Sequence, residues 1–332
     1  MNVRGERVFV GLSGGVDSAV SAALLQRAGA LVTGVFIKGW YPAGLPCTWA
    51  TDRRDAMRVA AHLHLPFHTL DASLEYKRGV IDYLLAEYRA GRTPNPDVMC
   101  NREVKFGAFY RFAKAHHADA IATGHYVSGE KDQRYFLWAV PKEALAATLF
   151  PLTGMEKVET RALARRFGLP VAEKKDSQGV CFLGSISVED FLRNEFGPTP
   201  GGAVTEKGER VGTHAGAVLY TIGERVVLDE APNGPWYVVA KNIETNELMV
   251  ARERTHKKMR FADGVAFSRE QWHQEADSVT AAQLRYRGPR IAGRVHGNRF
   301  FPSESLTELP TPGQSLVFYA GNALAGGGII DA

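Results

Sequence analysis

The hydrophobic positions of the chain follow two patterns, and the change between them falls near Pro198. Before it, apolar runs of strand length alternate with longer segments whose apolar residues recur at helical spacing. The predicted strands are residues 8–12, 31–37, 67–70 and 118–122, and the predicted helices are residues 16–28, 52–64, 74–90 and 103–116. This alternation is typical of βαβ units, so we predict an α/β, doubly wound parallel sheet with helices on both faces.

Such a sheet also indicates where a ligand binds. Ligands of open parallel sheets lie at the carboxyl ends of the strands. The loops that follow Leu12, Ile37, Asp71 and Thr123 are therefore expected to surround a site.

After Pro198 the apolar runs are short, and Gly, Pro and Asn separate them. The predicted strands are residues 217–222, 236–241, 247–251, 278–286, 290–296 and 314–319. This pattern favours small β domains or barrels. Residues 156–168 and 187–196 are predicted to form connecting helices. We divide the chain into a catalytic domain with a helical extension (1–196), a central β-rich domain (197–255) and a C-terminal β-barrel (256–332).

Composition agrees with a large folded protein. The chain has 332 residues, of which 45% are hydrophobic, enough for two or three domains. No apolar run approaches the roughly 18 residues of a membrane helix, and the first residues lack the apolar stretch of a signal peptide. We therefore expect a cytoplasmic location and no membrane partner. Three cysteines do not make a disulfide scaffold, so sulfur chemistry here would depend on individual thiols.

Positive charge is concentrated in one region. Residues 251–300 contain eleven Lys or Arg against five acids, a net charge of +6, so the remainder carries −2 of the overall +4. A basic region with interleaved aromatic residues is typical of a nucleic-acid partner, although a solvated basic surface would have the same composition. The aromatic candidates for base stacking are Tyr286, Phe300 and Phe301.

The first strand leads into a candidate phosphate site. Its Ser-Gly-Gly turn precedes a helix, where backbone N–H groups and the helix dipole favour an anion. The glycines allow close approach, the Ser13 and Ser18 hydroxyls add donors, and Asp17 is placed to orient Mg²⁺. No Gly-Lys-Ser/Thr follows, so this is not a Walker loop. An ordinary strand-to-helix turn is the alternative.

Two cysteines lie in polar, turn-rich segments. Cys100 follows a Pro-Asn-Pro-Asp stretch, which we predict to be an extended loop ending where a helix opens at Glu103. A position near a helix N-terminus favours the thiolate, and Asp97 lies three residues earlier. Cys181 follows Lys174 and Lys175 in a second glycine-containing loop. Either thiol could instead be an inert core residue.

At these motifs the chain resembles known families. Ser13-Gly14-Gly15-Val16-Asp17-Ser18 resembles the PP-loop of the N-type ATP pyrophosphatases, which adenylate a carbonyl oxygen and release pyrophosphate. Over nearly its whole length the chain is similar to the bacterial tRNA-specific 2-thiouridylases (MnmA/TrmU family). The motifs that carry this similarity are residues 86–101, Ala-Thr-Gly-His-Tyr at 122–126, Lys131-Asp132-Gln133, Lys-Lys-Asp-Ser-Gln-Gly-Val-Cys-Phe at 174–182, Arg285-Tyr286-Arg287 and Pro312-Gly313-Gln314.

The resemblance implies a PP-loop (adenine nucleotide alpha hydrolase-like) fold and ATP-dependent 2-thiolation of the wobble uridine in the tRNA anticodon loop. It implies that Cys181 receives a persulfide from an upstream sulfur-donor protein, and that Cys100 acts as nucleophile and forms a transient disulfide with Cys181. Asp97 would assist catalysis. The implied ATP-binding residues are Gly11, Leu12, Ser13, Gly14, Gly15, Val16, Asp17, Ser18, Ile37 and Gly124. Asn95, Pro96 and Asp97 would meet the target base, and Lys131, Asp132, Gln133, Arg285 and Tyr286 would contact tRNA.

Some alternatives stay open at this stage. Cys47 also matches the family, either as a small buried residue or as an iron–sulfur ligand with Cys100 and Cys181. The histidines lack metal-ligand spacing, but His125 is a candidate for the nucleotide pocket. Residues 224–230 carry acids where the family has a base and glycines, so altered tRNA docking is expected there. The rival functions are another PP-loop tRNA-modifying or amidating ligase and a non-catalytic RNA-binding relative.

Overall fold

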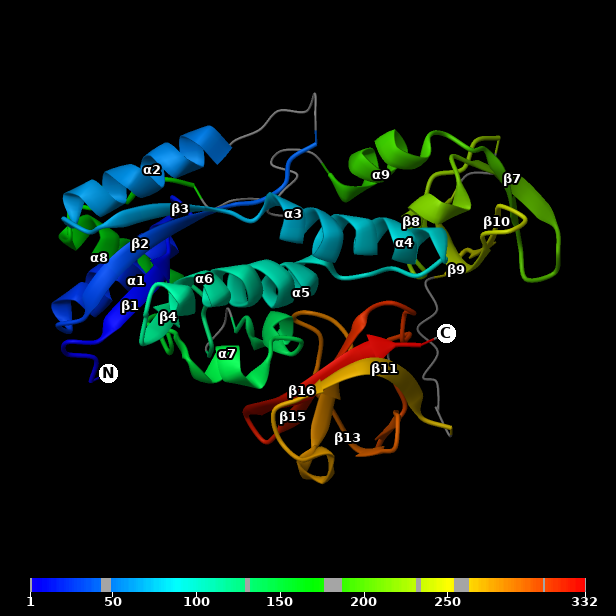
Figure 1. The fold of residues 1–332 in the computed structure, drawn as a ribbon. Helices are drawn as coiled ribbons and strands as arrows, with labels where there is room; N and C mark the ends of the chain where they lie inside the picture. Colours follow the sequence, from blue (N-terminus) through cyan, green and yellow to red (C-terminus); the bar gives the residue numbers. More distant parts are fainter. Residues whose placement is uncertain are drawn as a thin grey trace. The chain divides into compact units, whose positions relative to one another are not determined.

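The computed structural model describes residues 2–42, 49–128, 132–175, 187–230, 234–253, 263–306 and 308–331. The chain divides into two compact units (Figure 1). The first comprises Met1–Ile81 and Asp97–Ser185, and the second comprises Asp82–Pro96 and Ile186–Ala332. A segment of only 15 residues near the middle of the first half thus belongs with the C-terminal half. The predicted three-domain boundaries remain a prediction.

The first unit is built on a five-stranded sheet in the order β3-β2-β1-β4-β5. Its strands are β1 (Arg7–Gly11), β2 (Leu31–Lys38), β3 (Phe67–Asp71), β4 (Ala120–Ala122) and β5 (Thr148–Leu149). Every neighbouring pair is parallel, as the sequence pattern predicted. The strand order reverses at β1, between β2 and β4, so this is the position at which a doubly wound sheet binds ligands.

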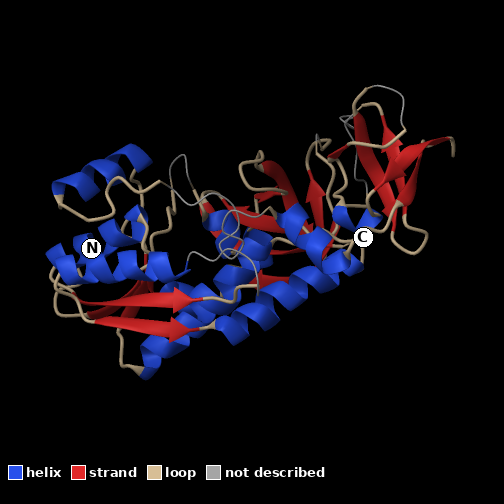
Figure 2. Ribbon diagram, turned by 90° about the horizontal axis from the view of Figure 1, so that it is seen from above, coloured by secondary structure: helices blue, strands red, loops and turns tan. Residues whose placement is uncertain are grey.

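Helices cover both faces of this sheet (Figure 2). Val8 and Val10 of β1 join the core formed with α1 (Val16–Arg27), α2 (Trp49–His62) and α8 (Lys157–Arg166). Phe9 points to the opposite face, where its ring lies 6.3 Å from that of Phe112 in α6 (Phe109–Ala115). The alternation of side chains along β1 therefore buries the strand on both sides.

Of the two longer helical runs, the first starts close to the prediction and the second starts earlier. Residues 73–89 form α3 (Ser73–Tyr76), η1 (Lys77–Asp82) and α4 (Tyr83–Arg89), close to the predicted helix. The second run begins at Pro96, with α5 (Pro96–Cys100) and η2 (Asn101–Ala108) leading into α6. The predicted helix start at Glu103 was therefore wrong. Proline is favourable in the first turn of a helix, because its fixed φ suits the helix and its missing N–H would have no partner there.

Shorter helices complete the first unit: η3 (Arg134–Leu137) and α7 (Lys142–Ala146). No helix within the described ranges is long and apolar enough to span a bilayer.

In the second unit, helix α9 (Val188–Phe196) precedes a mixed sheet in the order β7-β6-β10-β9-β8. Its strands are β6 (Gly201–Val204), β7 (Arg210–His214), β8 (Arg225–Val226), β9 (Trp236–Asn242) and β10 (Glu247–Ala251). The strand predicted at 217–222 is instead the 3-10 helix η4 (Ala217–Leu219). Gly216 has a φ of +143°, and its carbonyl accepts a hydrogen bond from the N–H of Leu219, which closes the turn.

The C-terminal residues form a closed barrel in the order β11-β14-β13-β12-β15-β16, with the short helix η5 (Ala276–Ser278). Its strands are β11 (Val265–Trp272), β12 (Ala281–Gln283), β13 (Ile291–His296), β14 (Arg299–Pro302), β15 (Ser315–Ala320) and β16 (Ala323–Ile330). The buried rings of Phe267, Phe300 and Phe318 contribute to its core. Phe300, which the sequence suggested as a stacking surface, is therefore a core residue, whereas Phe301 is 37% exposed.

Candidate functional site

The turn after β1 is held against the sheet and against α2. The N–H of Leu12 donates to the carbonyl of Val35 at 2.8 Å. Gly14 has a φ of +76°, and a Cβ there would lie 2.3 Å from the carbonyl oxygen of Asp52. Only glycine fits this position without a shift of the backbone.

Helix α1 begins directly after this turn. Gly15 is its extended N-cap residue, and no side-chain cap from the described residues satisfies the first-turn N–H groups. Such a helix end binds anions through its free N–H groups and its partial positive charge. The geometry therefore agrees with the phosphate cradle predicted from the sequence.

Two serine hydroxyls shape the cradle. The Oγ atoms of Ser13 and Ser18 lie 3.2 Å apart. Ser18 also accepts from the N–H of Ser13 at 3.2 Å and donates to the carbonyl of Gly15 at 3.2 Å. The hydroxyls thus organise the turn, and their predicted contact with phosphate stays a prediction.

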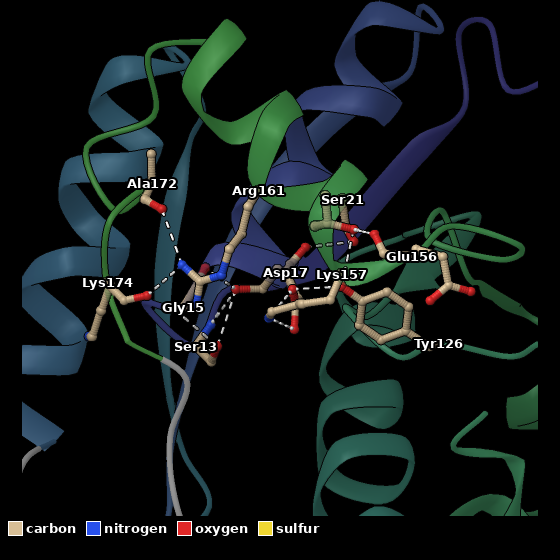
Figure 3. A network of polar contacts seen from close by, with 12 residues as sticks. Ser13, Gly15, Asp17, Ser21, Tyr126, Glu156, Lys157, Arg161, Ala172 and Lys174 are labelled. Atoms are coloured by element: carbon tan, nitrogen blue, oxygen red, sulfur yellow. Dashed lines mark hydrogen bonds and ion pairs between the residues drawn. The ribbon is translucent and has the colours of Figure 1, made fainter. Parts of the chain in front are cut away.

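Asp17 has partners that sequence reasoning missed (Figure 3). Its two carboxylate oxygens accept hydrogen bonds from Nζ of Lys157 at 2.7 and 2.9 Å. The hydroxyl of Tyr126 donates to the same carboxylate at 2.9 Å, and it lies 3.1 Å from Oγ1 of Thr160. Lys157 opens α8, whose N-terminus has a capping box formed by Glu156 and Glu159. The helix start was predicted from the sequence at residue 156, but no sequence signal indicated that Lys157 would pair with Asp17.

A second lysine, Lys174, forms ion pairs with α2 next to the cradle. Lys174 donates to Asp52 at 2.8 Å and to Asp55 at 2.7 Å, beside the backbone that Gly14 contacts. Burial alone would lower the pKa of Lys174, but these hydrogen bonds raise it above its usual value. Arg161 donates to the carbonyl of Lys174 at 3.1 Å (Figure 3). The segment that follows, 176–186, includes Cys181 and lies outside the described residues, as does Cys47.

The loop after β4 packs against the start of α1. A Cβ on Gly124 would lie 2.8 Å from the backbone nitrogen of Ser18, so this glycine permits close approach of the two loops. Ile37 lies near the end of β2, beside β1 in the sheet. The predicted ATP residues of the first unit therefore gather at the carboxyl ends of adjacent strands.

His125 lies next to Gly124 and is neutral. Its Nδ1 lies 2.8 Å from Oγ1 of Thr123, and its ring packs 5.5 Å from that of Phe106. Burial, with a further contribution from the charge of Lys105, lowers the pKa of His125 to about 3. The ring is thus an uncharged aromatic surface at physiological pH.

Asp97 and Cys100 lie on α5, one helical turn apart. Cys100 is only 3% exposed and is the last residue of α5, directly before η2, so it lies inside one continuous helical run. The helix N-terminus expected just after Cys100 lies instead at Pro96, four residues before it, and the dipole effect is strongest within the first turn. Burial raises the pKa of Asp97, and the charge of Lys105 opposes this effect. Lys105 thus acts electrostatically on both Asp97 and His125.

Among the predicted tRNA contacts, Asp132 and Gln133 have structural roles. Gln133 accepts from the N–H of Tyr126 through its side chain at 3.0 Å. Asp132 accepts from the guanidinium and backbone N–H of Arg134. Lys131 lies outside the described residues.

The predicted tRNA contacts of the barrel lie after β12, in a turn rather than in the predicted strand. Arg285 pairs with Glu308, with N···O distances of 2.5 and 2.8 Å. The guanidinium carbon of Arg287 lies 5.3 Å from the centre of the Tyr286 ring. Tyr286 and Phe301 remain candidates for base stacking.

Several arginines of the basic region instead stabilise the fold. Arg290 lies over the ring of Tyr319, and Arg252 lies over that of Trp236, each at 3.9 Å. Within the described part of the chain, no group of three His, Cys, Asp or Glu side chains could hold a metal ion. A carboxylate such as Asp17 still suits Mg²⁺ that arrives with nucleotide, since Mg²⁺ uses one or two carboxylates plus phosphate oxygens.

Comparison with known proteins gives consistent matches. Residues 6–185 match the family model of the tRNA methyl transferase HUP domain, and residues 189–252 match that of the tRNA methyl transferase PRC-barrel domain. A tRNA-specific 2-thiouridylase MnmA from Hahella chejuensis is 42% identical, covering 99% of this chain and 98% of its own. Similar proteins from Chromohalobacter salexigens and Enterococcus faecalis are each 41% identical, over 98% of this chain and 92% and 95% of theirs, respectively.

Proposed function

The chain belongs to the tRNA-specific 2-thiouridylase MnmA family, and on that premise we propose that it uses ATP to convert the wobble uridine of tRNA anticodons to 2-thiouridine. The observation that carries this proposal is the glycine turn before α1, which lacks a side-chain cap among the described residues and is packed on α2. This turn suits the phosphates of ATP. Cys100, in the family's cysteine motif, lies in the same unit, on α5.

The first step is adenylation of the uridine. O2 of the base attacks the α-phosphorus of ATP, and pyrophosphate leaves. Residues 11–18 would bind the phosphates, while Ile37 and Gly124 flank the nucleotide. Asp17 would orient Mg²⁺ once the incoming phosphates compete for Lys157, which now neutralises it. Adenylation makes the oxygen a good leaving group, so C2 can accept sulfur.

The second step is sulfur transfer. A donor protein would load Cys181 with a persulfide, and the thiolate of Cys100 would attack the inner sulfur of Cys181. This attack forms a Cys100–Cys181 disulfide and releases hydrosulfide, which attacks C2 and displaces AMP. A two-electron reductant then restores both thiols. The alternative is direct attack by the persulfide. The other route is an iron–sulfur cluster that Cys47, Cys100 and Cys181 would hold; Cys47 and Cys181 lie outside the described ranges.

The tRNA would contact both units. Asn95, Pro96 and Asp97 would meet the flipped uridine. Asp132 and Gln133 follow Tyr126, the partner of Asp17, so their loop is joined to the nucleotide site. Arg285 and Tyr286 are exposed and partly exposed, respectively, on the barrel. These roles rest on the family motifs at these positions.

Two rival functions are less well supported. An amidating ligase would use the same ATP chemistry with an amine nucleophile, and it would not need Cys100 and Cys181. A non-catalytic RNA-binding relative would not need the ordered turn or the partners of Asp17, yet both are intact.

A nucleoside assay tests the proposal. The purified protein is incubated with unmodified tRNA, Mg-ATP, a thiol reductant and either sulfide or a persulfide donor, and the digested tRNA is analysed by mass spectrometry. We expect 2-thiouridine and equimolar pyrophosphate, and we expect Cys100→Ser and Cys181→Ser each to abolish the product without changing ATP affinity. Cys47→Ser is the matched control for the persulfide route. Thiolation by either serine variant with a persulfide donor would contradict the two-thiol mechanism.

A further inference from the structure

Residues 82–94 lead directly into the target-base segment, Asn95-Pro96-Asp97. Residues 82–96 belong to the second unit, together with the barrel. The boundary between the two units therefore falls within this segment, between Pro96 and Asp97 in the first turn of α5. Two independent sets of contacts attach it to the barrel.

The first set surrounds Glu87 of α4. This carboxylate is only 3% exposed, and it accepts hydrogen bonds from both Nε and Nη2 of Arg92, at 2.5 and 2.9 Å. Arg269 of the barrel strand β11 donates to the same carboxylate at 3.0 Å. Burial alone would raise the pKa of Glu87, but the two guanidinium groups lower it below its usual value. Glu87 is therefore an ionised, buried centre that joins α4 to the barrel and to Arg92, which lies three positions before Asn95.

The backbone of Arg269 is adapted to this contact. Its φ is +53°, a left-handed conformation that is uncommon for a residue other than glycine. It lies within a break in the pairing of β11 with β16, between Ser268 and Gln271. A bulge of this kind redirects a side chain out of a strand's regular alternation. The strand thus departs from regular geometry at the residue that reaches Glu87.

The second set comes from the loop before β15. The carbonyl of Pro312 accepts from the N–H of Thr93 at 2.8 Å, and the side chain of Gln314 donates to the carbonyl of Thr93 at 2.7 Å. Gly313 lies between them with a φ of +89°, and a Cβ there would lie 2.8 Å from the nitrogen of Thr93. The Pro-Gly-Gln motif therefore binds both backbone polar groups of one residue, two positions before Asn95.

We propose that Glu87 and the Pro312-Gly313-Gln314 loop are positioning elements, through which the barrel sets the placement of the target-base segment for uridine thiolation. This rests on the proposed function. Neither element contacts the reacting atoms. Glu87 acts through Arg92, and the loop acts through Thr93. Loss of either contact lets the segment move, and a displacement of about 1 Å in a reacting group can cost on the order of a hundredfold in rate.

The test measures kcat and KM for thiolation by Arg269→Ala, Glu87→Gln and the double variant, at a temperature below the unfolding transition of each. We expect a fall in kcat of about tenfold to a hundredfold with unchanged affinity for ATP. We expect Arg269→Lys to recover most of the rate, because one donor suffices for its single hydrogen bond. The double variant should be no slower than Glu87→Gln, because Arg269 acts through Glu87. Arg193→Ala removes the arginine of a surface ion pair on α9 and is the matched control.

The loop is tested in parallel by Gln314→Ala, which removes the bond to the Thr93 carbonyl. We expect the same fall in kcat at unchanged ATP affinity. A folded Arg269→Ala variant with wild-type kcat would overturn the role of Glu87, and so would a double variant whose loss is the product of the two single losses. Wild-type kcat in Gln314→Ala would overturn the role of the loop. Absence of 2-thiouridine with the wild-type protein would instead refute the proposed function.

Discussion

Replacement of Gly14 by alanine tests whether the phosphate turn depends on its contact with α2. The new Cβ would lie 2.3 Å from the carbonyl oxygen of Asp52 and 3.0 Å from its carbonyl carbon, both backbone atoms. A change of rotamer therefore cannot relieve the clash, and the turn must move by about 1 Å to reach an ordinary contact distance. The left-handed φ of +76° adds a cost of about 1–2 kcal/mol for any residue with a Cβ.

Gly5 provides a matched control, since its φ is +80° but no described atom lies within 4 Å of its Cβ position. Gly5→Ala carries only the backbone cost, so the difference between the variants isolates the contact. We expect Gly14→Ala to lose about 1–3 kcal/mol more than Gly5→Ala. For a unit of this size, this corresponds to a Tm lower by roughly 2–12 °C.

The functional consequence is measured by equilibrium binding of Mg-ATP. Displacement of the turn should weaken binding at least about tenfold in Gly14→Ala, which is about 1.4 kcal/mol. Gly5→Ala should bind as the wild type does. Equal ATP affinity and equal Tm in the two variants would refute the assignment of the turn as a rigid phosphate cradle.

Four further outcomes are expected. Lys157→Ala should weaken ATP binding about tenfold, because Lys157 contacts Asp17 beside the cradle, and Lys157→Arg should retain most of the affinity. An unchanged Mg-ATP affinity in the alanine variant would contradict this. Lys105→Met should move the acid limb of the pH profile of kcat/KM for tRNA to higher pH, because Lys105 lowers the pKa of Asp97, whereas the exposed Lys142→Met should leave the limb in place. Ser187→Ala should cost about 1 kcal/mol in urea unfolding, since Ser187 Oγ caps α9 by accepting from the N–H of Asp190 at 3.0 Å; a loss below 0.3 kcal/mol would argue against the cap. Hydrogen bonds from Ser73 and Lys38 lower the pKa of Asp71 from 3.8 to about 2, so the stability they add is present above pH 4 and is lost as the pH falls towards 2. The urea midpoint should therefore decrease over this pH range, and the decrease should be smaller in Asp71→Asn.

Features that depend on nearby residues were predictable from the sequence. The strands of the first sheet and helix α1 have an apolar pattern that a few adjacent residues determine, and the predicted α1 ended within one residue of the observed end. The glycine turn was predictable because both its conformation and its chemistry lie in consecutive residues. The strand β16 was missed, since its glycines lack the usual pattern. Their absent Cβ atoms permit close packing on β11, where a Cβ at Gly326 would lie 2.4 Å from the carbonyl oxygen of Gln271.

Only the tertiary structure shows which distant residues contact the phosphate turn and the start of α1. Lys157 is 140 positions from Asp17, and no local pattern relates the two. Arg269 is likewise 182 positions from Glu87, and the contact depends on a bulge in a strand that the hydrophobic pattern did not reveal. The sequence by itself therefore determined the parallel sheet, the phosphate turn and the positions of the thiols, because each is encoded over a few residues. Only the folded chain determined the partners that neutralise Asp17 and anchor the target-base segment, because long-range packing selects them.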